Sequence, residues 1–163
     1  MKKKDLNYFV SAYKELLKIG DVQVAYAELV KYVQKLKTTF SKDLGDAYSF
    51  GNVFQGYMDY TYFYLSNDYL KNKKLKLGLV FNHNDVRFEA WLLGQTKDIQ
   101  EKYWKLLKST KWINGSEMPQ YSIFEVTLVD NPDFNDLDAL TENIKNKLIF
   151  VAENISASIQ LVD

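Results

Sequence analysis

Hydrophobic residues recur at helical spacing along the first forty residues of the chain. Leu6, Phe9 and Tyr13 begin one such series, and Gly20 stands where a left-handed helix cap would end it. Asp21 can cap a second helix, whose apolar stripe is made of Val22, Ala25, Tyr26, Leu29, Val33, Leu36 and Phe40. The pattern therefore predicts a helical hairpin.

The spacing of hydrophobic residues changes from helical to strand-like after residue 52. Val53–Leu65 is rich in aromatic and β-branched residues, and Leu75–Phe81 and Val86–Leu93 alternate between apolar and polar positions, which predicts three antiparallel strands. A helix over Lys97–Lys108 and a strand over Tyr121–Val129 follow. A capping signal at residues 130–133 then introduces a final helix, with Leu137, Leu140, Ile144, Leu148 and Val151 on its apolar stripe.

These elements predict an α/β (α+β) fold in one domain over residues 1–163. Its order is a helical hairpin, a three-stranded antiparallel meander, a crossover helix, a fourth strand and a C-terminal helix, with the helices packed on a mixed sheet. Ser41–Asn52 and Ser66–Lys74 are expected to be loops because both are polar and lack a hydrophobic period.

Composition excludes several classes of site. The 163 residues are 47% hydrophobic, enough for a core, and 21 basic residues balance 21 acidic ones, which argues against a broad surface for nucleic acid or an anionic membrane. The chain has no cysteine and one histidine, so thiolate chemistry and multi-histidine metal sites are excluded. No stretch approaches the roughly 20 apolar residues of a membrane span, and we expect a cytoplasmic protein without a cofactor.

The predicted hairpin places Val80 opposite Arg87, Gly78 opposite Glu89 and Lys76 opposite Trp91. One face of this hairpin then gathers the only arginine of the chain and a carboxylate in the middle of a strand. The other face is apolar and must belong to the core: Leu75, Leu77, Leu79, Phe81, Val86, Phe88, Ala90 and Leu92.

The preceding strand is expected to turn Gln55, Tyr57 and Asp59 toward the polar face, and Phe54, Met58, Tyr60, Tyr62 and Tyr64 toward the core. The candidate ligand- or partner-binding site is therefore Gln55, Tyr57, Asp59, Arg87, Glu89 and Trp91. In this hypothesis Arg87 donates hydrogen bonds, the two carboxylates accept them, and the aromatic rings form walls. A plain cross-strand charge network is the alternative interpretation.

Three other features have simpler interpretations than a site. His83 is expected to be an exposed turn residue, although Asp85 could orient its ring. The lysines of residues 71–76 could contact phosphates, but a solvated loop explains them. The acidic stretch Asp130–Asp138 lacks the spacing of a calcium loop and fits helix capping.

Four sequence motifs resemble those of an uncharacterised bacterial family of conserved hypothetical proteins, classed only as a domain of unknown function. The motifs are FQGYMDYTYF at residues 54–63, VFNH at 80–83, RFEAWLLG at 87–94 and NPDF at 131–134. The resemblance spans the chain from about Gly20 onward and implies no activity, cofactor or catalytic residue.

The element order is also similar to the core of restriction-endonuclease-like nucleases. That likeness implies a metal-binding role for Glu89, but Trp91 stands where such nucleases have a lysine, and Leu75–Phe81 contains no acid. The favoured hypothesis is thus a non-catalytic module that binds a small molecule or a protein. A divergent metal-dependent nuclease or phosphodiesterase is the alternative, and a homodimer interface formed by surplus aromatic residues is the third possibility.

Overall fold

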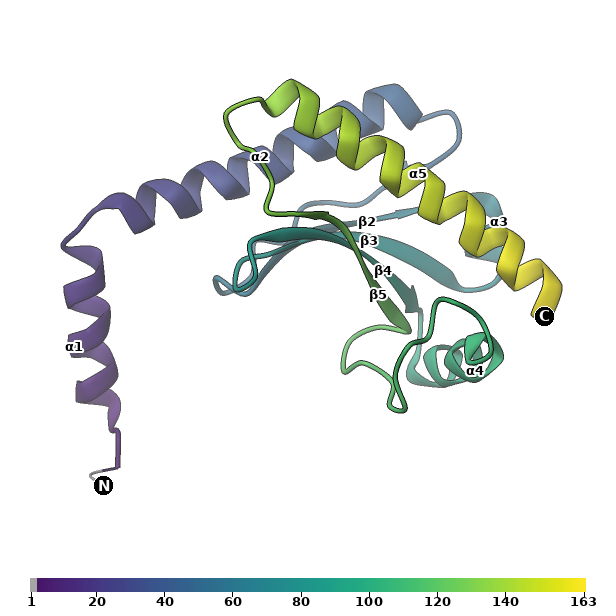
Figure 1. Ribbon diagram of the computed structural model, residues 1–163, viewed down its shortest axis with the longest axis horizontal. Helices are drawn as coiled ribbons and strands as arrows, with labels where there is room; N and C mark the ends of the chain where they lie inside the picture. The colour runs from purple at the N-terminus through teal and green to yellow at the C-terminus, as the bar shows by residue number, and fades with distance from the viewer. Residues whose placement is uncertain (1–2) are drawn as a thin grey trace.

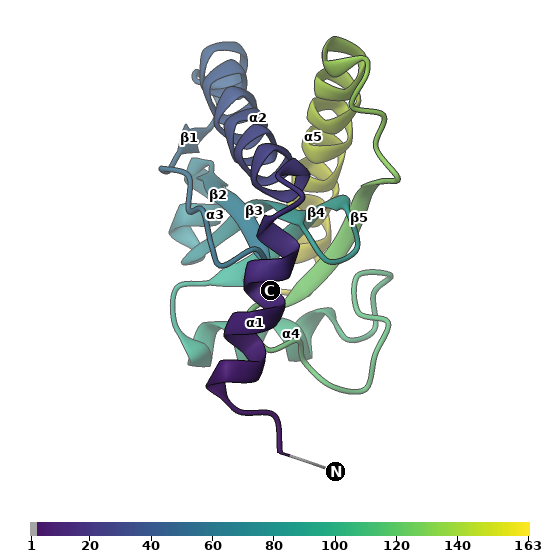
Figure 2. The ribbon, with the colours of Figure 1, turned by 90° about the vertical axis from the view of Figure 1, so that its left-hand side faces the viewer.

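Two long helices cover one face of a five-stranded sheet. The computed structural model describes residues 3–163. The strands follow one another in chain order: β1 (Ser49–Phe50), β2 (Tyr60–Ser66), β3 (Leu75–Asn82), β4 (Arg87–Gly94) and β5 (Phe124–Asp130). The helices are α1 (Leu6–Leu17), α2 (Asp21–Leu44), α3 (Asp68–Asn72), α4 (Lys97–Leu107) and α5 (Leu137–Val162), and α2 and α5 lie side by side above the sheet (Figures 1 and 2).

The α+β class is confirmed, but the predicted mixed sheet is wrong. Every neighbouring pair of strands is antiparallel. α4 connects β4 to its immediate neighbour β5, so it is not a crossover between parallel strands. The two expected loops also contain short elements, because β1 pairs with the end of β2 and α3 fills the connection before β3.

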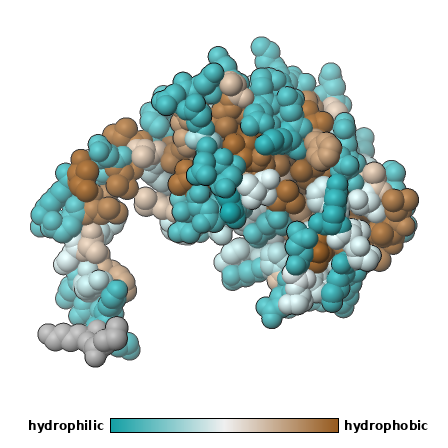
Figure 3. All heavy atoms as spheres, viewed as in Figure 1, coloured by the Kyte–Doolittle hydropathy of each residue, from teal (hydrophilic) through white to brown (hydrophobic). Residues whose placement is uncertain are grey.

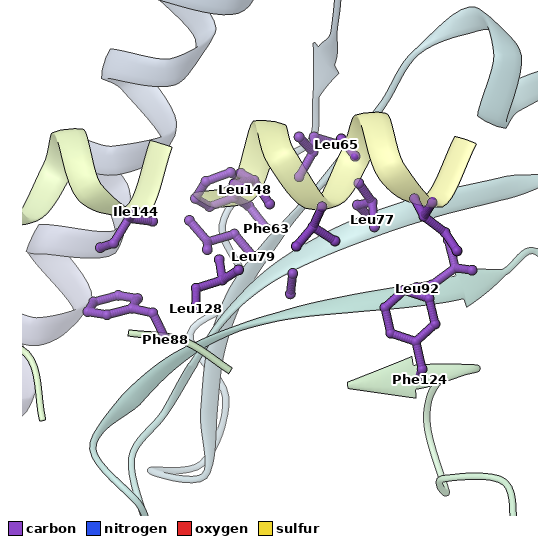
Figure 4. Packing of buried hydrophobic residues seen from close by; sticks show 14 of the residues in the cluster. Phe63, Leu65, Leu77, Leu79, Phe88, Leu92, Phe124, Leu128, Ile144 and Leu148 are labelled. Carbon is purple, nitrogen blue, oxygen red and sulfur yellow. The ribbon is translucent and has the colours of Figure 1, made fainter. Parts of the chain in front are cut away.

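The core lies between the covered face of the sheet and these two helices (Figure 4). Alternate residues of β3 and β4, among them Leu79 and Leu92, belong to one buried cluster with Ile144 and Leu148 of α5. Each large apolar side chain buried in this way contributes roughly 1.5–3 kcal/mol to folding. The alternation predicted for the hairpin is confirmed, except that Val86 is exposed in the turn.

The predicted helical hairpin is wrong. In the described part of the chain, none of the residues of α1 is buried. Gly20, at φ 82°, changes the direction of the chain, and α1 points away from the sheet as an arm (Figures 1 and 2). Helical spacing shows that an apolar stripe needs a partner, but it does not show which surface supplies that partner.

Candidate functional site

The face of the sheet opposite α2 and α5 carries an aromatic cluster. Val80, Trp91 and Leu93 pack against Tyr60, Tyr62 and Tyr64, and within residues 3–163 this cluster consists of sheet residues alone. We call this surface the open face. Figure 1 shows no helix lying across it between α1 and α4.

The strand register arranges the open face in rows. One row runs Tyr60, Asn82, Arg87, Asp130; the next runs Tyr62, Val80, Glu89, Thr127; the third runs Tyr64, Gly78, Trp91, Glu125. The predicted hairpin register was therefore wrong by two positions. The turn is a four-residue loop, His83 to Val86, in which Val86 adopts a left-handed φ of 50° that β-branched residues rarely take. A shift of two preserves the faces, so Arg87, Glu89 and Trp91 still share one side.

The faces assigned to β2 were reversed. Thr61, Phe63 and Leu65 point into the core, and the three tyrosines of the strand lie on the open face. The strand begins at Tyr60, because Gly56 at φ 74° and Met58 at φ 64° interrupt the extended chain before it. The alternation within β2 was predicted correctly, but its two sides were assigned to the wrong faces of the sheet.

Glu89 is the buried carboxylate at the centre of the open face. Its side chain is 2% exposed and accepts from Arg87 Nε at 2.6 Å, from Asn82 Nδ2 at 3.2 Å and from Trp91 Nε1 at 2.8 Å. The hydrogen bond to Glu89 raises the pKa of Arg87. Three donors occupy both carboxylate oxygens, as a buried charge requires.

The same network anchors the turn between β3 and β4. Asn82 Oδ1 accepts from the backbone N–H groups of Asn84 and Asp85, at 3.0 and 3.1 Å. Arg87 Nη2 also lies 3.5 Å from the Asp85 carboxylate. These contacts support the interpretation of Arg87 and Glu89 as a cross-strand charge network, since the charged groups of Arg87 and Glu89 and the amide of Asn82 all bind other groups of the chain.

The other three candidate residues lie in the loop that precedes β2. Asp59 accepts from the backbone N–H groups of Tyr57 at 2.9 Å and Tyr60 at 2.6 Å, and these bonds, the first above all, lower its pKa. The Gln55 carbonyl accepts from the Thr61 hydroxyl at 2.8 Å, and Tyr57 is 95% exposed. No hydrogen bond or ion pair among the described residues joins this loop to Glu89, so the six candidates form two groups.

His83 is half-buried, whereas an exposed residue was expected. Its Nε2 lies 2.7 Å from the Thr61 hydroxyl, and its ring packs 4.8 Å from that of Phe81 and 5.4 Å from that of Tyr26. Burial lowers the pKa of the ring. The backbone N–H of His83 donates to the Asp59 carbonyl at 2.9 Å, which joins the hairpin turn to the loop before β2.

Cavities adjoin two sides of the open face. One, of about 270 Å³, is lined by Lys71, Lys74 and Lys76 with Ser66, Leu75 and Gln95. The Lys76 ammonium lies 3.7 Å above the Tyr64 ring, and burial lowers its pKa. The other, of about 570 Å³, lies along β5 and includes Glu125, Thr127 and Phe150.

Sequence reasoning missed the tyrosines of β2. The signal was present, since Tyr60, Tyr62 and Tyr64 alternate with the apolar residues Phe63 and Leu65.

Residues 3–163 contain no group of three or more histidine, aspartate or glutamate side chains placed to hold a metal ion. Among the same residues, no helix combines the length and apolar character needed to cross a membrane.

Comparison with known proteins gives one match. Residues 6–159 match the family model described as Domain of unknown function (DUF7000). No curated protein matches the chain, and no solved structure matches it. The predicted resemblance to a family of unknown function is confirmed.

Proposed function

Since the chain belongs to the DUF7000 family, whose description assigns no activity, we propose a function from the site itself. The chain is a non-catalytic binding module, and its open face binds a protein partner. The observation that carries this proposal is the aromatic cluster of Tyr60, Tyr62, Tyr64, Val80, Trp91 and Leu93, which lies on the face of the sheet opposite α2 and α5.

The composition of this surface is unusual for the outer side of an antiparallel sheet. Such a side normally carries polar residues facing water. Here Tyr60 packs edge-on to Trp91 at 4.9 Å, and Phe54 stacks on Tyr62 at 5.2 Å, which extends the aromatic surface beyond the strands. Tyrosine and tryptophan are enriched at protein interfaces because they offer large apolar area together with a polar group.

The shape and the charges of the surface favour a protein over a small molecule. The tyrosine rings are half-buried and lie in a row along β2, so an occupant would lie across them. Lys76 stands at one end of the face, and Glu125 and Asp130 stand on its far strand. An extended partner can satisfy charges of both signs at this separation.

The non-catalytic part of the proposal is supported by Glu89. Both of its oxygens accept hydrogen bonds from Arg87, Asn82 and Trp91. These donors occupy three of its roughly four lone-pair positions, and the side chain is 2% exposed, whereas a general base or a metal ligand must reach its substrate or ion. No observation on the described open face favours the nuclease or phosphodiesterase alternative.

The test compares proteins captured from a lysate of the source organism by three immobilised chains. Tyr62→Glu places a charge in the middle of the face, and Tyr121→Glu is the control, because Tyr121 is exposed and lies outside the aromatic cluster. We expect a partner retained by the wild type and the control and lost with Tyr62→Glu. With the purified partner, Kd should rise at least tenfold for Tyr62→Glu only.

Two results would overturn the proposal. One is a set of captured proteins that Tyr62→Glu leaves unchanged. The other is a small molecule that is released from the denatured wild-type chain but not from denatured Tyr62→Glu, which would make the face a ligand site. Circular dichroism must show the same folded spectrum for all three chains.

A further inference from the structure

α1 carries an apolar stripe that nothing in the described chain covers. Leu6 is 75% exposed, Phe9 54% and Tyr13 62%, and these residues follow one another at helical spacing with Val10 and Leu16, which are also exposed. The opposite side of the helix is polar, with Asn7, Ser11, Lys14 and Lys18. A stripe of this width is typical of a helix that packs on another surface.

The helix is too short to be stable without such a surface. It has 12 residues, and helices of that length are marginal in water when isolated. Asp5 caps it by accepting from the Tyr8 N–H at 2.9 Å, which favours its formation but does not cover its stripe. Large exposed apolar patches mark interaction surfaces, so α1 is placed to pack against a partner.

The arm borders a hollow that has apolar residues on its other side. Figure 3 shows this hollow between α1 and the body of the molecule. Tyr26 of α2 lies 3.5 Å from the carbonyl oxygens of Gln55 and Gly56, which places the loop of residues 54–58 beside the first half of α2. In that loop Phe54, Tyr57 and Met58 are exposed.

We propose that the partner of α1 is a second copy of this chain. In a two-fold dimer, the arm of each copy enters the hollow of the other and packs its stripe against α2 and the 54–58 loop. The surface is self-complementary, because each chain provides both the apolar arm and the apolar residues beside the hollow. A two-fold axis therefore buries two identical arm-to-hollow contacts at once. The net charge of zero also removes long-range repulsion between copies.

The area is sufficient for a stable dimer. Large side chains offer roughly 150–250 Å² each, so a half-exposed stripe of five residues provides roughly 500 Å² per arm. Two arms and two receiving surfaces then bury roughly 2,000 Å², which lies in the range of stable protein interfaces.

Sedimentation velocity of the full chain gives the first test. We expect twice the chain mass of 19.1 kDa at 10–100 µM. The variant Phe9→Asp/Tyr13→Asp should sediment as a single chain. The matched control Asn7→Asp/Ser11→Asp places the same number of aspartates on the polar side of the same helix and should remain a dimer.

Cysteine cross-linking tests whether the arm of one copy lies in the hollow of the other. The chain has no cysteine of its own, so only the introduced cysteines react. Two single variants, Leu16→Cys and Met58→Cys, are mixed and treated with a short bis-maleimide. A product that contains one chain of each kind is expected, and Ser11→Cys in place of Leu16→Cys should give much less. A dimer without the Leu16–Met58 product would overturn the arm exchange.

The remaining outcomes concern other occupants. A wild-type chain that stays monomeric at 100 µM would overturn the proposal. If that monomer bound phosphatidylglycerol vesicles and Phe9→Asp/Tyr13→Asp did not, the stripe would be a membrane-surface helix instead. Phe9→Asp/Tyr13→Asp lies outside the open face and should leave the binding of its partner unchanged, so this inference and the proposed function fail separately.

Discussion

Replacing Glu89 by glutamine is the most direct test of the network on the open face. All three partners of the carboxylate are N–H donors, from Arg87, Asn82 and Trp91. Glutamine has the same shape but offers one acceptor oxygen and one NH2 group. Whichever way the amide is turned, its NH2 group must face at least one donor, so a buried hydrogen bond is lost.

The magnitude follows from the burial of the groups. If the amide oxygen keeps Arg87 and Asn82, the indole N–H of Trp91, a residue 6% exposed, loses its acceptor. A buried donor left without a partner costs about 1–3 kcal/mol, and loss of the charge weakens the bond to Arg87 further. We expect Glu89→Gln to lower the free energy of unfolding by about 2–3 kcal/mol.

Urea unfolding at pH 7, followed by circular dichroism at one protein concentration, measures this change. Glu28→Gln is the control, since the side chain of Glu28 is 67% exposed and lies 3.9 Å from Lys31, where an ion pair contributes little. A change of less than about 0.5 kcal/mol for Glu89→Gln would refute the reasoning. A gain in stability would refute it more strongly, because a group whose removal stabilises the fold is retained for function and not for structure.

Three further changes test other contacts. Burial lowers the pKa of His83 from 6.5, so the unfolded chain takes up a proton at higher pH than the folded chain does. The free energy of unfolding should therefore fall as pH drops below about 6.5. Urea unfolding at several pH values measures this fall, which should be smaller in His83→Gln. Asp163→Asn should lower the free energy of unfolding by about 1 kcal/mol at pH 7, because Lys73 and Tyr103 lose a charged acceptor at 2.9 and 2.7 Å. That difference should shrink as pH falls below 3.8 toward the lowered pKa of Asp163. Gly56→Ala should lower Tm, since φ is 74° and the added Cβ would lie 2.1 Å from the Tyr60 carbonyl oxygen; an unchanged Tm would contradict this.

The sequence was sufficient where periodicity continues without interruption. α4 was expected over Lys97–Lys108 and lies at Lys97–Leu107. The alternation of β3 and β4 placed Arg87, Glu89 and Trp91 on one side of the sheet. In these segments each residue keeps the backbone conformation of its element, so spacing along the chain translates directly into direction in space.

The sequence was insufficient where single residues leave their usual conformation. Met58 and Val86 are left-handed although neither is glycine, and no local pattern announces this. Gly56 and Met58 end the extended chain before Tyr60, so residues 55–59 form a loop instead of the start of the strand, and Val86 belongs to the hairpin turn instead of to β4. Contacts from distant parts of the chain hold such residues in place, so they become visible only in the folded structure.

The two surfaces proposed here differ in how they are supported, and this difference bears on what each can bind. The open face is rigid, because its side chains sit on four paired strands and the Glu89 network joins β3 to β4. A rigid aromatic surface loses little conformational entropy when a partner binds. Within residues 3–163 the arm has no such support, since no residue of α1 is buried and the chain turns at Gly20. Its stripe is expected to be ordered by association itself, so dimerisation through the arm would set the assembly while the open face stays free for a partner.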